Sequence, residues 1–302
     1  MDPAVVIPPE LRARLVQMRL SARRAQGDRG FGQHASRSRG AGMEFAQYRP
    51  YAPGDEPRQI DWKLFARSDR HYVREAERDS PLTAWVLVDT SASMGQGDAA
   101  RKHWTRLDAA RVVTACLLEL AIRQGDRIGV LAVSEAGLRW TEAAGGPRHR
   151  DRTLLSMRDW TARGVWPTEA VLRPAWERIR PGDMVVAIGD GFDDGMIALL
   201  ERLAAARREV VFVQVLTAEE RDFPFDGGRR FVDPENGAEL IADGPASRVD
   251  WLAAFADARR VLDARLDAAG IRHAVAWLDR PLDEPLRALF PARGGRTLPT
   301  PA

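Results

Sequence analysis

The sequence predicts an α/β fold, a doubly wound, mostly parallel sheet with helices on both faces, preceded by an N-terminal extension. Two observations lead to this prediction. After Pro81, short runs rich in β-branched residues alternate with longer segments of helical periodicity. Gly, Asp and Pro residues bound the short runs, which is typical of strand ends.

The expected elements follow one another along residues 83–280. Strands are predicted at 84–89, 127–133, 138–141, 184–189, 209–216 and 272–278. Helices are predicted at 106–123, 152–161, 169–179, 195–207 and 247–269. A hairpin formed by 229–232 and 238–241, around a Pro-Glu-Asn-Gly turn, interrupts the alternation. We expect residues 281–302 to form a C-terminal tail, disordered from Pro291 onward.

Residues 1–42 are predicted to form a basic helix and a mobile segment. The first forty positions contain eight Arg residues but only three acidic residues. Leu11, Leu15 and Met18 recur at helical spacing over residues 9–24. A basic amphipathic helix suits a membrane surface, nucleic acid or an acidic partner. A helix that docks on its own domain explains the pattern equally well. Residues 43–82 are expected to pack on the main domain as a separate extension.

Composition narrows the class of protein. Hydrophobic residues make up 45% of the chain, which is ordinary for a globular protein. The 45 basic residues nearly balance 43 acidic ones, so the overall charge gives no argument for a nucleic-acid partner or an acidic substrate. The single cysteine, Cys116, excludes an intramolecular disulfide framework and a cysteine-rich zinc site. It lies in an apolar helical run, so we expect a buried, inert thiol. No signal peptide or membrane-spanning run is recognisable, and a cytoplasmic location is predicted.

Oxygen-bearing side chains follow the ends of predicted strands. Asp89, Ser91 and Ser93 come directly after the first strand, and Asp190 follows the strand at 184–189. Thr168 opens a helix after Gly164-Val165-Trp166-Pro167. Ligands of open parallel sheets bind outside the carboxyl ends of the strands, so these groups are expected to converge.

Such a set of ligands suits a hard divalent cation, Mg²⁺ or alternatively Mn²⁺ or Ca²⁺, since it offers oxygen alone. Hydroxyls with two acids leave the ion short of negative charge. We therefore expect an open coordination position that a carboxylate from a partner protein fills. The alternative is that these Asp, Ser and Thr residues simply cap the helices that follow.

Asp89-Thr90-Ser91-Ala92-Ser93 after a buried strand, followed by Thr168 and Asp190, resembles the metal-ion-dependent adhesion site of von Willebrand factor A domains. Those domains have a Rossmann-like, three-layer architecture. The resemblance implies that Ser91 and Ser93 coordinate the metal directly. It implies that Asp89, Thr168 and Asp190 bind it directly or through water.

The sequence departs from that pattern at a few positions. Ala92 stands where Gly is usual, which keeps a small residue. Thr168 follows Trp166-Pro167 rather than a Gly pair, so Thr161 is a rival for its role. Asp193 or Asp194 could share the duty of Asp190.

A second motif precedes the sheet. Tyr48-Arg49-Pro50-Tyr51-Ala52-Pro53-Gly54-Asp55, Ile60-Asp61-Trp62-Lys63, Ala66-Arg67 and Tyr72-Val73-Arg74-Glu75 are similar to the signature of the bacterial "domain of unknown function 58" family. The resemblance spans residues 40–280. It implies a von Willebrand-like domain after the signature and a protein partner, commonly a MoxR-like AAA+ ATPase, with a role as adaptor or chaperone.

The signature residues Asp55, Asp61, Trp62, Lys63 and Arg67 are expected to be mainly structural. We expect Trp62 in the core and a buried ion pair between Asp61 and Arg67. A catalytic role for these residues is the alternative.

The predicted function is that of a non-enzymatic, metal-dependent protein-binding module. The first alternative is a nucleic-acid or membrane-surface binder acting through the basic helix. The second is a metal-dependent phosphoryl-transfer enzyme that uses Asp89 as nucleophile. Such enzymes need a second Asp two residues later, where Ser91 stands, and a Walker phosphate loop is absent from the sequence.

Overall fold

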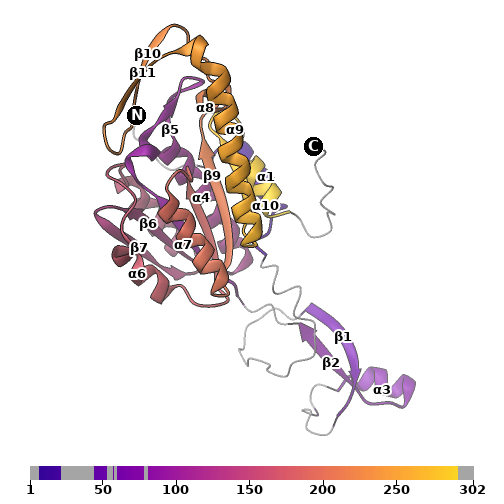
Figure 1. Ribbon diagram of the computed structural model, residues 1–302. Helices are drawn as coiled ribbons and strands as arrows, with labels where there is room; N and C mark the ends of the chain where they lie inside the picture. The colour runs from indigo at the N-terminus through magenta and orange to yellow at the C-terminus, as the bar shows by residue number, and fades with distance from the viewer. Residues whose placement is uncertain (1–6, 22–43, 53–56, 58–59, 78–80, 292–302) are drawn as a thin grey trace. The chain divides into compact units, whose positions relative to one another are not determined.

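The computed structural model describes residues 7–21, 44–52, 57, 60–77 and 81–291, with the backbone alone at 44–49 and 74–77 (Figure 1). The chain forms two compact units. The larger unit comprises Met1–Arg29 and Leu82–Ala302, and the smaller unit comprises Gly30–Pro81. The smaller unit is therefore an insertion in the sequence of the larger one.

A six-stranded sheet forms the centre of the larger unit (Figure 1). Its strands are β3 (Thr83–Asp89), β6 (Arg127–Ser134), β7 (Gly137–Ala144), β8 (Met184–Gly189), β9 (Glu209–Leu216) and β12 (Arg272–Trp277). Their order in the sheet is β12-β9-β8-β3-β6-β7. All neighbours pair in parallel except β6 and β7, which are antiparallel. The mostly parallel sheet confirms the predicted fold class.

Helices cover both faces of this sheet. They are α1 (Pro9–Leu15), α4 (Arg106–Gln124), α5 (Pro147–Ser156), α6 (Glu169–Arg178), α7 (Asp194–Ala205), α8 (Ala218–Asp222), α9 (Gly244–Ala268) and α10 (Asp283–Leu289), with the 3-10 turns η2 (Ala92–Gly95) and η3 (Met157–Asp159). Two short hairpins, β4 (Gly97–Asp98) with β5 (Arg101–Thr105) and β10 (Gly228–Val232) with β11 (Glu239–Asp243), complete the unit. None of the helices in the described ranges is long and apolar enough to cross a membrane.

The side chains of β3 show how the three layers are held together. Successive residues of a strand point to opposite faces of a sheet. Val86 and Val88 accordingly lie in the core on the α4 side, whereas Trp85 and Leu87 lie in the core on the side of α6 and α7. A strand that is buried on both faces reads as a continuous apolar run, as β3 and β8 do.

The N-terminal helix is shorter than predicted and docks on its own unit. Helix α1 ends at Leu15, and residues 16–21 continue without helix; residues 22–24 lie outside the described ranges. The side-chain amide of Gln124 explains this early end, since its oxygen accepts from Leu20 N at 2.8 Å and its nitrogen donates to Leu20 O at 3.1 Å. These bonds replace the helical bonds of that turn.

The apolar side of this segment is buried. Leu11, Leu15, Met18 and Leu20 all belong to the core on the α4 side. The docked arrangement is therefore confirmed, and these side chains are covered by the protein itself.

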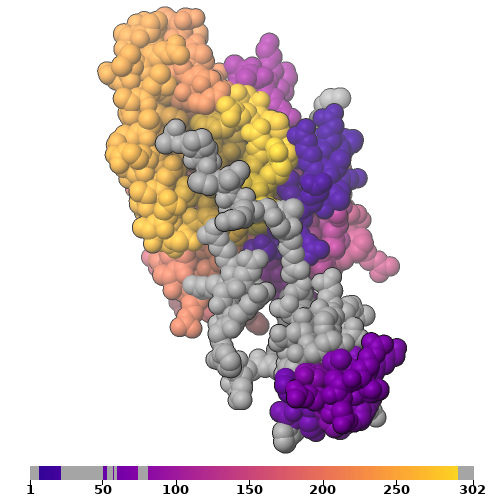
Figure 2. All heavy atoms as spheres, turned by 90° about the vertical axis from the view of Figure 1, so that its right-hand side faces the viewer, coloured from indigo at the N-terminus to yellow at the C-terminus, as the bar shows by residue number. Residues whose placement is uncertain are grey.

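The compact unit extends beyond residue 280, contrary to the predicted tail. Helix α10 follows β12, and Leu286, Leu289 and Phe290 are buried in the same core as α1. Arg14 of α1 donates to Asp283 at 3.0 Å. Figure 2 shows α1 in indigo beside yellow C-terminal residues. Residues 292–302 lie outside the described ranges.

The helix predicted at 152–161 begins earlier and ends earlier, as α5 (Pro147–Ser156), with η3 after it. Pro147 is the first residue of the helix, where a missing N–H costs nothing and the fixed φ favours helix. Gly146 precedes it with a φ of 88°, which an L side chain rarely adopts. This pair sets the start of α5.

The smaller unit pairs β1 (Glu44–Pro50) with β2 (Tyr72–Glu77) and carries α3 (Trp62–Ser68) between them. Asp61 caps α3, accepting from the backbone N–H groups of Lys63 and Leu64 at 3.0 Å. The predicted core position of Trp62 is wrong, because its side chain is 57% exposed. Its ring instead lies edge-on to Phe65, at a centroid distance of 6.0 Å.

The predicted buried ion pair between Asp61 and Arg67 is also wrong. Arg67 is exposed on α3, so no pair that it forms is buried. The helix has seven residues and none of them is buried, which leaves no apolar shelter for such a pair. Asp55 lies outside the described residues.

Candidate metal centre

The candidate site lies where the strand order of the sheet reverses. From β3 the chain proceeds to β6 on one side, and the later strands β8, β9 and β12 are added on the other. At such a switch point the loops that leave adjacent strands diverge and open a crevice. Asp89 ends β3, and Asp190 directly follows β8. The two strand ends approach closely, since a Cβ on Gly189 would lie 3.0 Å from the Cβ of Asp89.

The loop after β3 brings its polar side chains together. Asp89 Oδ1 accepts from the backbone N–H of Ser91 at 2.8 Å. The hydroxyl oxygens of Ser91 and Ser93 lie 3.0 Å apart. Asp89 and Ser91 are each 1% exposed, and Ser93 is half-buried. The backbone N–H of Ala92 donates to Gly164 O at 2.8 Å, which ties this loop to the segment before α6.

The spacing of the two hydroxyls fits a small octahedral cation. Mg²⁺ binds oxygens at about 2.0–2.1 Å, so neighbouring ligands of its octahedron lie about 3.0 Å apart. Ca²⁺, with bonds of about 2.3–2.6 Å, would need about 3.3–3.7 Å in the same geometry. The observed 3.0 Å is also the length of the hydrogen bond that joins the two hydroxyls. The spacing of these two hydroxyls is therefore compatible with magnesium as well as with the hydrogen bond between them.

The carboxyl group of Asp89 has a raised pKa. Burial, and next the negative charge of Asp190, raise the pKa of Asp89 to about 7; the backbone and side chain of Ser91 lower it, and Glu235 of the β10–β11 turn raises it. A buried carboxylate in such surroundings is costly to ionise. A divalent cation bound beside it would reverse this effect, because the ion becomes the largest local charge.

Asp190 is held differently, by a residue that the sequence analysis missed. Its Oδ2 accepts from Nη1 of Arg106 at 2.9 Å, and its Oδ1 accepts from the backbone N–H of Phe192 at 3.2 Å. Arg106 is the first residue of α4 and is 1% exposed. Its signal in the sequence is an Arg at the first position of a helix, where the helix dipole disfavours a cation.

Glu220 is the second carboxylate that Arg106 contacts, and it too was not predicted. Its Oε1 forms a close ion pair with Nη2 of Arg106. Its Oε2 accepts from the backbone N–H of Thr217 at 2.9 Å and from the Thr217 hydroxyl at 3.0 Å, as part of the capping box of α8. Both carboxylate oxygens of Glu220 therefore have partners, Arg106 for Oε1 and Thr217 for Oε2.

Thr168 stands at the start of α6, as predicted. It is exposed, and its hydroxyl makes no capping hydrogen bond. Its rival Thr161 is also exposed, and it lines a small hollow with Thr90 and Arg163. Thus the structure brings Asp89, Ser91, Ser93 and Asp190 together at one edge of the sheet, and the ligand role of Thr168 stays a prediction.

The two other acids after β8 have separate tasks. Asp193 caps α7, accepting from the N–H groups of Gly195 at 2.7 Å and Met196 at 3.1 Å. Asp194 is exposed and pairs with Arg265 of α9 at 2.8 Å. Neither of these contacts involves Asp190.

Other reactive side chains have structural surroundings. His149 Nε2 lies 2.7 Å from the carbonyl oxygen of Ile128, to which it donates. Burial raises the pKa of the Cys116 thiol to about 12, so the thiol is neutral and buried as expected. Among the described residues, no three His, Cys, Asp or Glu side chains gather as a metal-binding group, so the candidate centre depends on its two serines.

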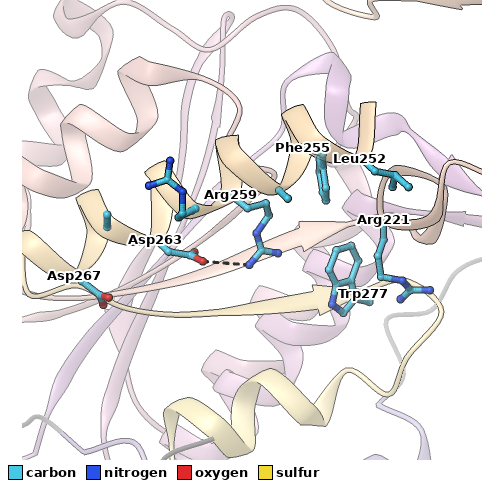
Figure 3. A pocket seen from close by; sticks show the side chains of 10 residues that line it. Arg221, Leu252, Phe255, Arg259, Asp263, Asp267 and Trp277 are labelled. Atoms are coloured by element: carbon cyan, nitrogen blue, oxygen red, sulfur yellow. Dashed lines mark ion pairs between the residues drawn. The ribbon is translucent and has the colours of Figure 1, made fainter. Parts of the chain in front are cut away.

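A larger hollow, of about 720 Å³, lies between α9 and the end of β12 (Figure 3). Trp277 forms its floor, with the guanidinium groups of Arg221 and Arg259 at 5.1 Å and 5.8 Å from the ring centroid. Arg259 also pairs with Asp263 at 3.7 Å. The arginines are thus engaged with groups of the hollow itself.

Comparisons with known proteins agree with the sequence motifs. The family model "Protein of unknown function DUF58" matches residues 47–261. The uncharacterized proteins Rv1480 of Mycobacterium tuberculosis and Mb1516 of Mycobacterium bovis are each 32% identical over 272 residues, which is 84% of this chain and 84% of theirs.

Several solved structures are similar to this chain. The conserved hypothetical protein BatB from Bacteroides thetaiotaomicron has 13% identity and a TM-score of 0.42, covering 69% of this chain and 95% of that chain. The VWA domain of SpRpn10 has 14% identity and a TM-score of 0.41, covering 68% of this chain and 94% of that chain.

The architecture matches the expectation from the adhesion-site motif. A mostly parallel sheet lies between two layers of helices, and the motif stands at the point where the strand order reverses. This is the von Willebrand factor A-like arrangement predicted from the sequence. With the family model matched over most of the chain and mycobacterial relatives covered over most of their length, the chain belongs to the DUF58 family.

Proposed function

We propose that this protein is a divalent-metal-dependent protein-binding module. Ser91 and Ser93 would bind the metal directly, and Asp89, Asp190 and Thr168 would bind it directly or through water. The observation that carries the proposal is the 3.0 Å spacing of the two serine hydroxyls beside the buried Asp89. The octahedral edge of Mg²⁺ equals this spacing and that of Ca²⁺ is longer, so Mg²⁺ is proposed first, with Mn²⁺ or Ca²⁺ as the alternatives.

The site suits binding rather than closed structural coordination. Two serines and one or two carboxylates leave an octahedral ion with positions for water or for an outside ligand. Phe192, two residues after Asp190, is 56% exposed and provides an apolar surface beside the crevice. An exposed aromatic beside a charged centre is typical of a contact that dominates binding energy. We propose that a carboxylate of a partner protein completes the coordination.

The identity of that partner is a finer proposal. The resemblance to the family signature implies a MoxR-like AAA+ ATPase and a role as adaptor or chaperone in the cytoplasm. The prediction is that the ATPase from the same organism binds this protein in Mg²⁺ and is released by EDTA. Isothermal titration of the two purified proteins in each condition measures it. Binding of equal affinity in EDTA would contradict a role for the metal.

Metal-dependent stabilisation tests the site directly. A ligand that binds the folded state alone raises the midpoint of thermal unfolding. We expect Mg²⁺ or Mn²⁺ to raise the midpoint of the wild-type protein above its value in EDTA, and to leave the midpoint of Ser91→Ala unchanged.

Ser134→Ala is the matched control. Ser134 ends the neighbouring strand β6 at the same edge of the sheet and is half-buried. It should keep the full response to metal. If wild type and both variants respond to no divalent cation, the residues after β3 only shape the loop, and the metal proposal is wrong.

A further inference from the structure

Arg106 places a buried positive charge beside the candidate metal centre. Nη1 donates to Asp190 at 2.9 Å and to the carbonyl oxygen of Ser93 at 3.2 Å. Nη2 pairs with Glu220. The exposed ring of Phe192 lies over the guanidinium, with its centroid 5.4 Å away. The cation therefore touches both loops of the site and is shielded from water.

The positive charge of Arg106 does not stabilise helix α4. A cation in the first turn opposes the partial positive charge of a helix N-terminus. The capping of α4 is complete without Arg106, since Thr105 and Asp108 form a capping box. Removing a cation from water is also costly unless acids compensate it. The groups that compensate Arg106 are Asp190 and Glu220, so its position is accounted for by the site and not by the helix.

The charged groups around Arg106 leave a net negative charge when the acids are ionised. Asp89, Asp190 and Glu220 contribute three negative charges when ionised, and Arg106 offsets one of them. The remaining two negative charges equal the charge of one divalent cation. The same guanidinium occupies an oxygen of Asp190 that a metal or a metal-bound water would otherwise use.

We propose that Arg106 is an internal cation that competes with the metal for Asp190 and so weakens the metal affinity of the site. This inference rests on the proposed metal-binding function. Glu220 opposes the competition, because its carboxylate shares the guanidinium with Asp190 and offsets its positive charge. Arg106 and Glu220 thus act on metal affinity in opposite directions, although neither is a ligand of the metal.

Two variants follow from this opposition. Replacing Arg106 alone would strand Glu220 as a buried, unpaired carboxylate, so the double variant Arg106→Gln/Glu220→Gln is used. It leaves the net charge of the site unchanged and frees the Asp190 oxygen that Arg106 occupies. It should bind Mn²⁺ about tenfold more tightly or better, because this carboxylate oxygen becomes available to the metal. Glu220→Gln leaves Asp190 as the main acid of Arg106, and should bind Mn²⁺ several-fold more weakly.

The measurement is a titration of each full-length variant with Mn²⁺, in which the electron paramagnetic resonance signal of free Mn²⁺ gives the dissociation constant. Arg101→Gln is the matched control, since it removes the same charge from β5, where the guanidinium lies 3.8 Å over the Trp104 ring. Its dissociation constant should equal that of wild type. Melting curves in EDTA confirm that each variant is folded.

The outcomes separate this inference from the proposed function. If wild type binds Mn²⁺ and the double variant binds it equally or more weakly, Arg106 assists the site and the inference is overturned while the proposed function stands. If the double variant binds Mn²⁺ and wild type does not, the inference is supported and the native protein works without metal. If no variant binds Mn²⁺, both ideas are overturned.

Discussion

Two loops leave the sheet side by side, and each starts with a buried aspartate. Asp89, after β3, is 1% exposed, and Asp190, after β8, is 2% exposed. Asp190 faces the guanidinium of Arg106. Asp89 receives the N–H of Ser91, and its pKa is raised to about 7 by burial and by the charge of Asp190. The two aspartates are thus equally buried but differ in their surroundings, because Arg106 contacts the carboxylate of Asp190, whereas a backbone N–H is the contact of Asp89.

The largest expected effect is a gain of stability from Asp89→Asn in metal-free protein. One pKa unit corresponds to about 1.4 kcal/mol, so the charged Asp89 costs the folded state up to about 4 kcal/mol at pH 8. The folded-state pKa lies above the unfolded one. The stability of wild type should therefore fall between about pH 4 and pH 7, whereas the variant lacks this loss.

Urea denaturation of both proteins in EDTA, from pH 4 to pH 8, measures the difference. The two curves should converge at pH 4, and the variant should show no stabilisation by Mg²⁺. A constant gap at every pH would show that Asp89 does not titrate in this range, and the contrast between the loops would then fail.

Asp190→Asn should act in the opposite direction. It removes a charge-assisted hydrogen bond from Arg106, which typically contributes about 1.5–3 kcal/mol, and leaves the cation with Glu220. We expect a loss of about 2 kcal/mol at pH 8, measured by the same denaturation. A variant as stable as wild type would mean that Glu220 alone compensates Arg106.

A smaller effect is expected at Thr168. Its exposed hydroxyl makes no capping hydrogen bond, so Thr168→Val should change the free energy of unfolding in EDTA by about 0.5 kcal/mol or less. The rise of the melting midpoint on adding Mg²⁺ should shrink if Thr168 is a ligand. Thr161→Val is the paired variant, and the reverse pattern would assign the role to Thr161.

The smallest effect is expected from Glu235→Gln. The negative charge of Glu235 in the β10–β11 turn raises the pKa of Asp89, but less than burial or Asp190 does. The variant should shift the pH dependence of stability slightly toward lower pH. If Glu235→Gln removed most of the fall in stability between about pH 4 and pH 7, the hairpin turn would be a main part of the site.

The sequence predicted the loop after β3 better than the loop after β8. Asp89, Ser91 and Ser93 are close in sequence, so their spacing after a buried strand already indicates a shared site. Arg106 and Asp190 are 84 positions apart, and Arg106 and Glu220 are 114 apart. No local pattern indicates such partners, because the sheet and not the sequence brings them together.

The same distinction explains the fold. Strands β8 and β9 begin and end where predicted, since each is a short apolar run with polar or turn-forming residues on both sides. Helix α10 and the early end of α1 were not predicted, because both depend on contacts with distant residues such as Gln124 and Arg14. Long-range packing sets these boundaries.

The insertion of the smaller unit has a further consequence for how the chain is connected. Both of its links lead to the larger unit, through α1 on one side and β3 on the other. Helix α1 is held without the help of its link, by Leu11 and Leu15 in the core and by the ion pair of Arg14 with Asp283. A protein cut once between α1 and β1 should therefore run as one particle on a sizing column and as two fragments in detergent. Residues 7–21 thus anchor the chain segment that precedes the inserted unit to the larger unit.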